Sequence, residues 1–154
     1  MVALDPKVVR YYDADSVYRL EPREERSSNS HRHYFSCINE AWSNLPETLA
    51  ERFPTAEHLR KYTLIKAGYF DARTIVAAST AEAQRIAAFV RPLDEFAVVT
   101  AREATVAVYT ARSQSVRAMG AKEFAASKNA VLDELASMIG TDSKTLAQNA
   151  GRAA

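Results

Sequence analysis

The chain contains a single cysteine, Cys37, among its 154 residues, so no disulfide can form within it. A lone cysteine fits a reducing compartment, and we expect a cytoplasmic protein. No apolar run approaches the ~18 residues that a transmembrane helix requires, so no membrane partner is expected. The N-terminal residues also lack the apolar core of a signal peptide, which argues against secretion.

The chain has almost no net charge, at +1 with the histidines neutral. A dedicated nucleic-acid-binding protein is often far more basic, so any binding to nucleic acid would have to come from a local patch. The composition, 47% hydrophobic and 25% charged, is that of an ordinary globular protein. The length corresponds to one domain.

Helical periodicity and end signals predict four helices. The first starts in the polar run 27–30 and ends before Pro46, with apolar residues at helical spacing along it, and a short helical turn can follow at 47–52. The second covers 56–67, capped by Thr55 and stopped by Gly68.

The third and fourth helices follow later in the chain. Ser79 and Glu82 match the capping box, in which each side chain satisfies the other residue's backbone donor, and predict a helix over 80–90. The last helix is expected from Ala121 to Ile139, with Gly140 as its stop. Its apolar stripe can pack on the domain's own sheet or on a second subunit: Phe124, Val131, Leu135 and Met138.

Alternating apolar and polar residues predict the strands. Residues 73–78 form one, and 95–101 with 105–111 form an antiparallel hairpin. Residues 8–20 are interpreted as one edge strand or two short strands. The predicted fold is therefore a single α+β domain over 1–140, about three to four helices packed on a small antiparallel sheet. The tail, 141–154, is small and polar and is expected to be flexible.

The sequence contains only weak signals for a catalytic or metal-binding site. His33 and Cys37 lie four residues apart with His31 nearby, but a zinc site needs three or four ligands and nothing supplies the rest. Cys37 lies on an apolar stripe, so we expect a buried thiol and no nucleophile. We therefore predict no catalytic residue, no metal and no cofactor. A metal-dependent nuclease, which would need converging carboxylates, is kept as an alternative.

Basic residues are the stronger signal. They flank the start of the first helix, where free N–H groups attract anions, and they recur in the second helix and before the last one. Serine, glutamine and arginine at a helix entrance can hold phosphate oxygens. These segments either converge on one positive surface or form solvated helix faces balanced by acids elsewhere. The residues are Arg26, His31, Arg32, Arg60, Lys61, Arg112, Ser113, Gln114, Ser115, Arg117, Lys122 and Lys128.

Three motifs, in order, resemble those of the NinB (Orf) phage recombination proteins and a related uncharacterised phage family. They are Arg26-Ser27 leading into 31–35, then Leu59-Arg60-Lys61-Tyr62 with 67–71, then Ser113-Gln114-Ser115 with Met119 and Glu123-Phe124. The second motif is similar to the uncharacterised family alone. The chain departs from the NinB pattern at Ser30-His31, where that pattern usually has glutamine-asparagine, and at Phe35, where it has tryptophan. The segment 75–99 has no counterpart.

The resemblance implies a small phage-encoded homodimer in the host cytoplasm. Such a protein would bind single-stranded DNA or its coating protein, the single-strand-binding protein, and help to load a recombinase, without catalytic chemistry of its own. The predicted nucleic-acid-binding residues are Arg26, His31, Arg32, Lys61, Arg112, Ser115, Arg117 and Lys122. The alternatives are a phage inhibitor that binds a host protein and the nuclease. An exposed apolar patch without a contiguous basic surface would favour the inhibitor.

Overall fold

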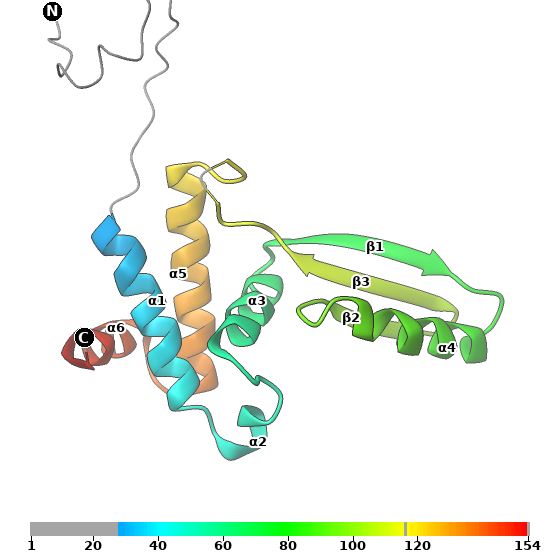
Figure 1. The fold of residues 1–154 in the computed structure, drawn as a ribbon, viewed down its shortest axis with the longest axis horizontal. Coiled ribbons are helices and arrows are strands. Elements are labelled where there is room, and N and C mark those ends of the chain that lie inside the picture. The colour runs from blue at the N-terminus through cyan, green and yellow to red at the C-terminus, as the bar shows by residue number, and fades with distance from the viewer. Residues whose placement is uncertain (1–27, 116, 154) are drawn as a thin grey trace, which may run out of the picture.

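A buried apolar stripe organises the helical part of the molecule. The computed structural model describes residues 28–115 and 117–153, and the predicted strands at 8–20 lie outside these ranges, as does Arg26. Helix α1 (Ser28–Ser43) buries Tyr34, Cys37 and Ile38 against helices α3 (Ala56–Lys66) and α5 (Ala121–Met138). A one-turn helix, α2 (Glu47–Ala50), links α1 to α3. Figure 1 shows α1, α3 and α5 gathered in one body.

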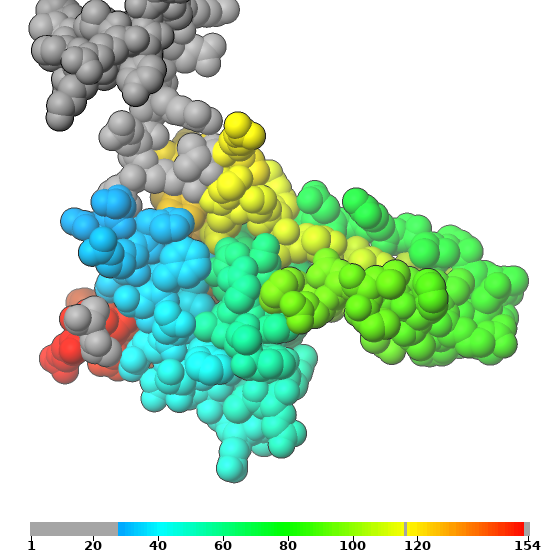
Figure 2. All heavy atoms as spheres, viewed as in Figure 1, coloured from blue at the N-terminus to red at the C-terminus, as the bar shows by residue number. Residues whose placement is uncertain are grey.

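The remaining elements form an arm that projects from this helical body (Figures 1 and 2). The arm contains strands β1 (Phe70–Val76), β2 (Val98–Arg102) and β3 (Thr105–Ala111), with helix α4 (Thr80–Val90) and the 3₁₀ turn η2 (Arg91–Leu93) between β1 and β2. The sheet is antiparallel in the order β1-β3-β2. Helix α4 covers one face through a second, small core of Ala83, Ala87 and Val106.

The predicted α+β fold is confirmed as a single small domain with a three-stranded antiparallel sheet. The predicted number of helices, about three to four, was too low. The described residues contain six α-helices. Strand β1 begins at Phe70, three residues before the predicted start. Phe70, Asp71 and Ala72 pair with the end of β3, a partner that local propensity does not register.

The local end signals act mostly as expected. The Thr55 hydroxyl accepts the His58 N–H at 3.3 Å, and the Ser79 hydroxyl accepts the Glu82 N–H at 3.1 Å. The capping box differs in its second half, because Glu82 accepts from the N–H of Ala78 instead of Ser79. Gly68 and Gly140, at φ 92° and 71°, end α3 and α5 in the left-handed conformation that glycine tolerates.

The expectation of a flexible tail over 141–154 was wrong. Residues Ser143–Ala153 form helix α6, which packs on α1 and α5. Asp142 caps it, since its carboxylate accepts the Thr145 N–H at 2.9 Å. Leu146 and Ala150, one turn apart, are each 1% exposed. The apolar stripe of α5 therefore packs on helices of the same chain. Its burial is explained without the two expected alternatives, which were the chain's own sheet and a second subunit.

A substitution tests the packing of α6. Leu146→Ala should lower the free energy of unfolding by about 3 kcal/mol, because a buried leucine is replaced by a cavity. Urea denaturation followed by circular dichroism measures this. Lys144→Ala, an exposed position on the same helix, is the control and should change little. Equal midpoints for the two variants would mean that α6 does not pack on the body.

Candidate nucleic-acid interface

Helices α1 and α5 run side by side and begin at the same end of the body (Figure 1). The imidazole of His31 stacks on the ring of Phe124 at 5.6 Å, so the first turn of each helix contacts the other. One turn further along α5, the Lys128 ammonium donates to the hydroxyl of Ser30, in the first turn of α1, at 2.6 Å. We call this end of the molecule, with the loop residues 112–115 and 117–120, the helix-start end.

The helix-start end is electrostatically suited to an anion. Both helix dipoles place their positive ends there, and the first turn of α1 contains no acidic residue. The N-cap residue of α5 is Gly120, which has no side chain to cap the first N–H groups of the helix. Its first-turn acid, Glu123, is neutralised by Arg112 through an ion pair of 2.7 Å.

The loop 112–120 is attached to the body at both ends. At its start, the backbone N–H of Arg112 donates to the carbonyl of Tyr69 at 3.0 Å. At its end, Met119 is buried in the main core. Between these points, the carbonyl of Ser115 accepts from the N–H of Met119 at 3.0 Å and closes a turn that contains the exposed Arg117.

Gln114 anchors the middle of this loop in a buried polar network. Its side-chain oxygen accepts two hydrogen bonds, from Arg60 Nη1 at 2.6 Å and from the Tyr34 hydroxyl at 3.1 Å. Its amide nitrogen donates to the Ser127 hydroxyl at 2.8 Å, and that hydroxyl donates to the carbonyl of Phe124. One side chain therefore ties the loop to α1, α3 and α5.

Glu57 holds the other side of the Arg60 guanidinium. Its two carboxylate oxygens accept from Arg60 Nε at 2.7 Å and Nη2 at 2.6 Å, a bidentate ion pair. Burial by itself would lower the pKa of Arg60, but the hydrogen bonds and charge of Glu57 outweigh burial and raise it. The same hydrogen bonds lower the pKa of the Glu57 carboxyl. Both groups are therefore ionised at neutral pH.

The structure brings most of the predicted contact residues to the helix-start end. His31 and Arg32 are exposed near the start of α1, Ser115 and Arg117 are exposed on the loop, and Lys122 is exposed in the first turn of α5. Arg112 also lies there, half-buried beside Glu123. Lys61 is on α3, where its charge helps to lower the pKa of Glu57. Arg26 is outside the described residues.

Two residues that the sequence analysis placed among the phosphate-binding groups point inward instead. Arg60 is 9% exposed, and its guanidinium bonds to Glu57 and Gln114. Gln114 is also 9% exposed and is bonded to protein groups on three sides. Both therefore position the loop, and neither presents a charge or amide to a ligand on the surface.

Cys37 is fully buried, as expected, and burial raises the pKa of its thiol. Its sulfur lies 3.7 Å from His33 Nε2, which is the pairing that suggested a metal site. Among residues 28–115 and 117–153, no three His, Cys, Asp or Glu side chains gather closely enough to hold a metal ion. The buried thiol is protonated at neutral pH and is a component of the apolar core.

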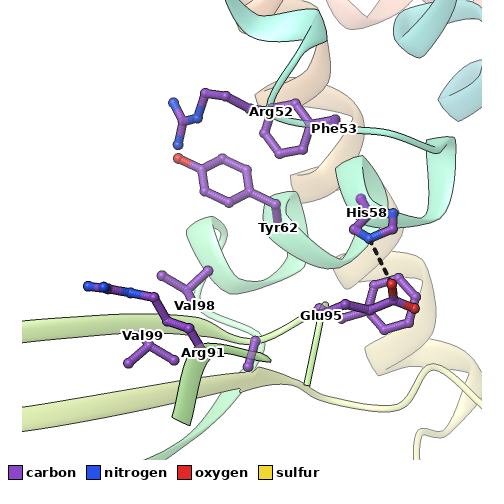
Figure 3. A pocket seen from close by; sticks show the side chains of 10 residues that line it. Arg52, Phe53, His58, Tyr62, Arg91, Glu95, Val98 and Val99 are labelled. Carbon is purple, nitrogen blue, oxygen red and sulfur yellow. Dashed lines mark ion pairs between the residues drawn. The ribbon is translucent and has the colours of Figure 1, made fainter. Parts of the chain in front are cut away.

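A concave site lies elsewhere, lined by residues that the sequence did not single out as a site. It is a hollow of about 340 Å³ between α3 and the start of β2, and its walls include Arg52, Tyr62 and Arg91 (Figure 3). These three residues are spread over forty positions of the sequence and share no motif. In the sequence only their residue types hint at a site, because arginine and tyrosine are common in sites that bind anionic or aromatic ligands.

Comparisons with protein-family models, curated proteins and solved structures find no match to this chain. The resemblance to the NinB proteins therefore stays a hypothesis that rests on the three motifs and their order. In the part of the chain that the structure describes, no helix is long and apolar enough to cross a bilayer.

The lowered pKa of Glu57 makes stability depend on pH. Because the folded-state pKa is below the unfolded one, the ion pair stabilises the protein above the unfolded carboxyl pKa of about 4.3. That contribution is lost as the pH falls through the lower folded-state value. Glu57→Gln should remove this part of the acid dependence in urea titrations between neutral and acidic pH. Glu51→Gln, an exposed carboxylate, is the control, and identical pH profiles for both variants would contradict the prediction.

Gln114 is expected to contribute more than its own hydrogen bonds. Gln114→Met preserves shape but removes the acceptor shared by Arg60 Nη1 and the Tyr34 hydroxyl, and buried donors left without an acceptor are costly. We expect unfolding to become easier by about 3 kcal/mol in urea denaturation. Ser113→Ala, in the same loop but exposed, should cost little. A Gln114→Met variant as stable as Ser113→Ala would show that the network does not anchor the loop.

Proposed function

We propose that the protein binds the sugar–phosphate backbone of single-stranded DNA at the helix-start end. The observation that carries this proposal is that two helix N-termini and several basic side chains lie at the same end of the molecule (Figure 1). Arg32, Arg117 and Lys122 are exposed there, together with the imidazole of His31, while Arg112 and Glu123 pair with each other. Because phosphate contacts carry no base code, binding would be sequence-tolerant and salt-sensitive.

The role that follows is that of an accessory protein in phage recombination. The resemblance to the NinB proteins supports it, together with a second subunit and a place in the host cytoplasm. The second partner in this proposal is the single-strand-binding protein, because that protein coats the DNA that this surface would bind. No catalytic step is part of this proposal.

A titration tests the proposed surface. The double variant Arg117→Gln/Lys122→Gln should bind a labelled single-stranded oligonucleotide more weakly. Its plot of log affinity against log salt should be flatter by about 1.4, or ~0.7 for each lost phosphate contact on a single strand. Fluorescence anisotropy at several salt concentrations measures both quantities.

The matched control is Arg73→Gln/Arg85→Gln, which removes two exposed positive charges from the arm. It should keep nearly the full salt slope, because its charges lie outside the helix-start end. Duplex DNA of the same length is titrated alongside and should bind less tightly. Equal slopes for the two double variants would refute the proposed surface.

One observation favours a second candidate, a protein that binds a host protein. The arm exposes large apolar side chains, with Val76 79%, Phe89 71% and Leu93 68% accessible. Exposed apolar groups on a projecting element are typical of protein-binding surfaces. Absence of oligonucleotide binding at low salt would make this candidate the better explanation. For the nuclease, the described residues offer no cluster of carboxylates or histidines that would support it.

A further inference from the structure

The hollow between the helical body and the arm has two unlike walls (Figure 3). The body provides Arg52, Phe53 and Tyr62, and the arm provides Arg91, Val98 and Val99. Its volume of about 340 Å³ is at the lower end of the range for small-molecule sites. We call it the arm cleft.

The body wall of the arm cleft is aromatic and firmly supported. The rings of Phe53 and Tyr62 pack at 5.1 Å, and the Arg52 guanidinium lies over both, 5.7 Å and 5.6 Å from their centroids. Behind this wall, the indole N–H of Trp42 donates to the carbonyl of Phe53 at 2.8 Å. The wall therefore offers a fixed aromatic surface with a cation at its edge.

One end of the arm cleft is closed by a contact between body and arm. The His58 ring of α3 packs against Phe96 in a tilted arrangement with the ring centroids 4.7 Å apart, and its Nε2 lies 3.5 Å from the Glu95 carboxylate. The other imidazole nitrogen, Nδ1, is 2.7 Å from the Thr55 hydroxyl, which holds the ring in place. Glu95, the carboxylate in the lining, is thereby directed toward this closed end.

The open end carries positive charge. In Figure 3 the polar ends of Arg52, Tyr62 and Arg91 lie on the same side of the hollow, opposite His58 and Glu95. No carboxylate within the described ranges forms an ion pair with either arginine. The arm cleft thus combines two available guanidinium groups, a phenol, aromatic rings and an apolar floor of valines.

From this arrangement we infer that the arm cleft binds a nucleotide unit, meaning a planar base joined to a phosphate. Arg52 and Arg91 bind the phosphate through charge-assisted hydrogen bonds, and Tyr62 with the valines contacts the base. An anion without a ring would leave the aromatic and apolar surfaces unused, and a neutral ring would leave both guanidinium groups unpaired. The nucleotide can be free or can be one unit of a single strand.

The arm cleft is separate from the helix-start end, so this inference goes beyond the proposed function. The two sites use different faces of α3: Arg60 bonds to the loop, while His58 and Tyr62 line the cleft. Loss of DNA binding at the helix-start end would leave nucleotide binding in the cleft intact. The two hypotheses can therefore fail independently.

Trp42 provides the probe, since it is the one tryptophan of the chain and hydrogen-bonds to the cleft wall. Adenosine monophosphate should change its emission saturably when excitation is at the red edge, where adenine does not absorb. Adenosine and inorganic phosphate should each bind at least about tenfold more weakly, because each lacks one half of the recognised chemistry. Isothermal titration calorimetry on the same protein confirms the affinities. No binding of the monophosphate at millimolar concentration would overturn the inference.

The decisive variants remove one charge at a time. Arg91→Gln and Arg52→Gln should each weaken adenosine monophosphate binding by about tenfold. Arg85→Gln is the matched control: it is an exposed arginine on α4, outside the lining, and should bind as the unaltered protein does. Arg117→Gln/Lys122→Gln should also leave this affinity unchanged. Equal affinities for Arg91→Gln and Arg85→Gln would overturn the assignment.

The source of the nucleotide follows from a comparison with a short oligodeoxyadenylate. If the oligonucleotide binds more tightly than the monophosphate and Arg91→Gln weakens both, the cleft holds one unit of a strand. If both bind equally and Arg91→Gln weakens both, the cleft holds a free nucleotide. A polyglutamate peptide that displaces the monophosphate at equal concentration would instead indicate a site for acidic protein segments, and would overturn the inference.

Discussion

The three hydrogen bonds of the Gln114 side chain determine where the loop 112–120 lies, and much of the molecule depends on that position. The loop joins the arm to α5, so its anchor on α1 and α3 also sets how the sheet leaves the body. Glu57 is part of the same arrangement, because it neutralises the buried Arg60 charge that Gln114 alone could not balance. With the inward charges paired, Arg117 and Lys122 are left exposed at the helix-start end.

Helix α3 connects the two candidate sites. One of its faces carries Glu57 and Arg60 toward the loop, and another carries His58 and Tyr62 toward the arm cleft. The arm has its own small core of short side chains, Ala83, Ala87 and Val106, so α4 lies close to the sheet. The contacts of His58 with Glu95 and Phe96 link the arm to the body.

Much of the local structure could be predicted because its causes lie within a few residues of each other. Thr55 and Ser79 cap helices through bonds to N–H groups three positions on, and Gly68 and Gly140 stop helices through their own backbone conformations. The short connection between β2 and β3 brings together strands that are adjacent in sequence. The cluster of basic residues near two helix starts was also visible, since His31, Arg32, Arg117 and Lys122 each lie beside a predicted start.

What needed the tertiary structure was the direction in which polar and small residues point. Arg60 and Lys61 are neighbours in sequence, yet a rotation of about 100° per residue turns Arg60 toward a buried glutamine 54 positions away. The tail is polar in composition, but Leu146 and Ala150 pack on α1 and α5, which makes α6 a helix. Sequence by itself determined the longer helices α1, α3, α4 and α5, the β2–β3 hairpin and the basic helix starts, because local hydrogen bonding and periodicity encode them. Only the packing of distant segments decided which charges are buried, which are exposed, and where the arm cleft forms.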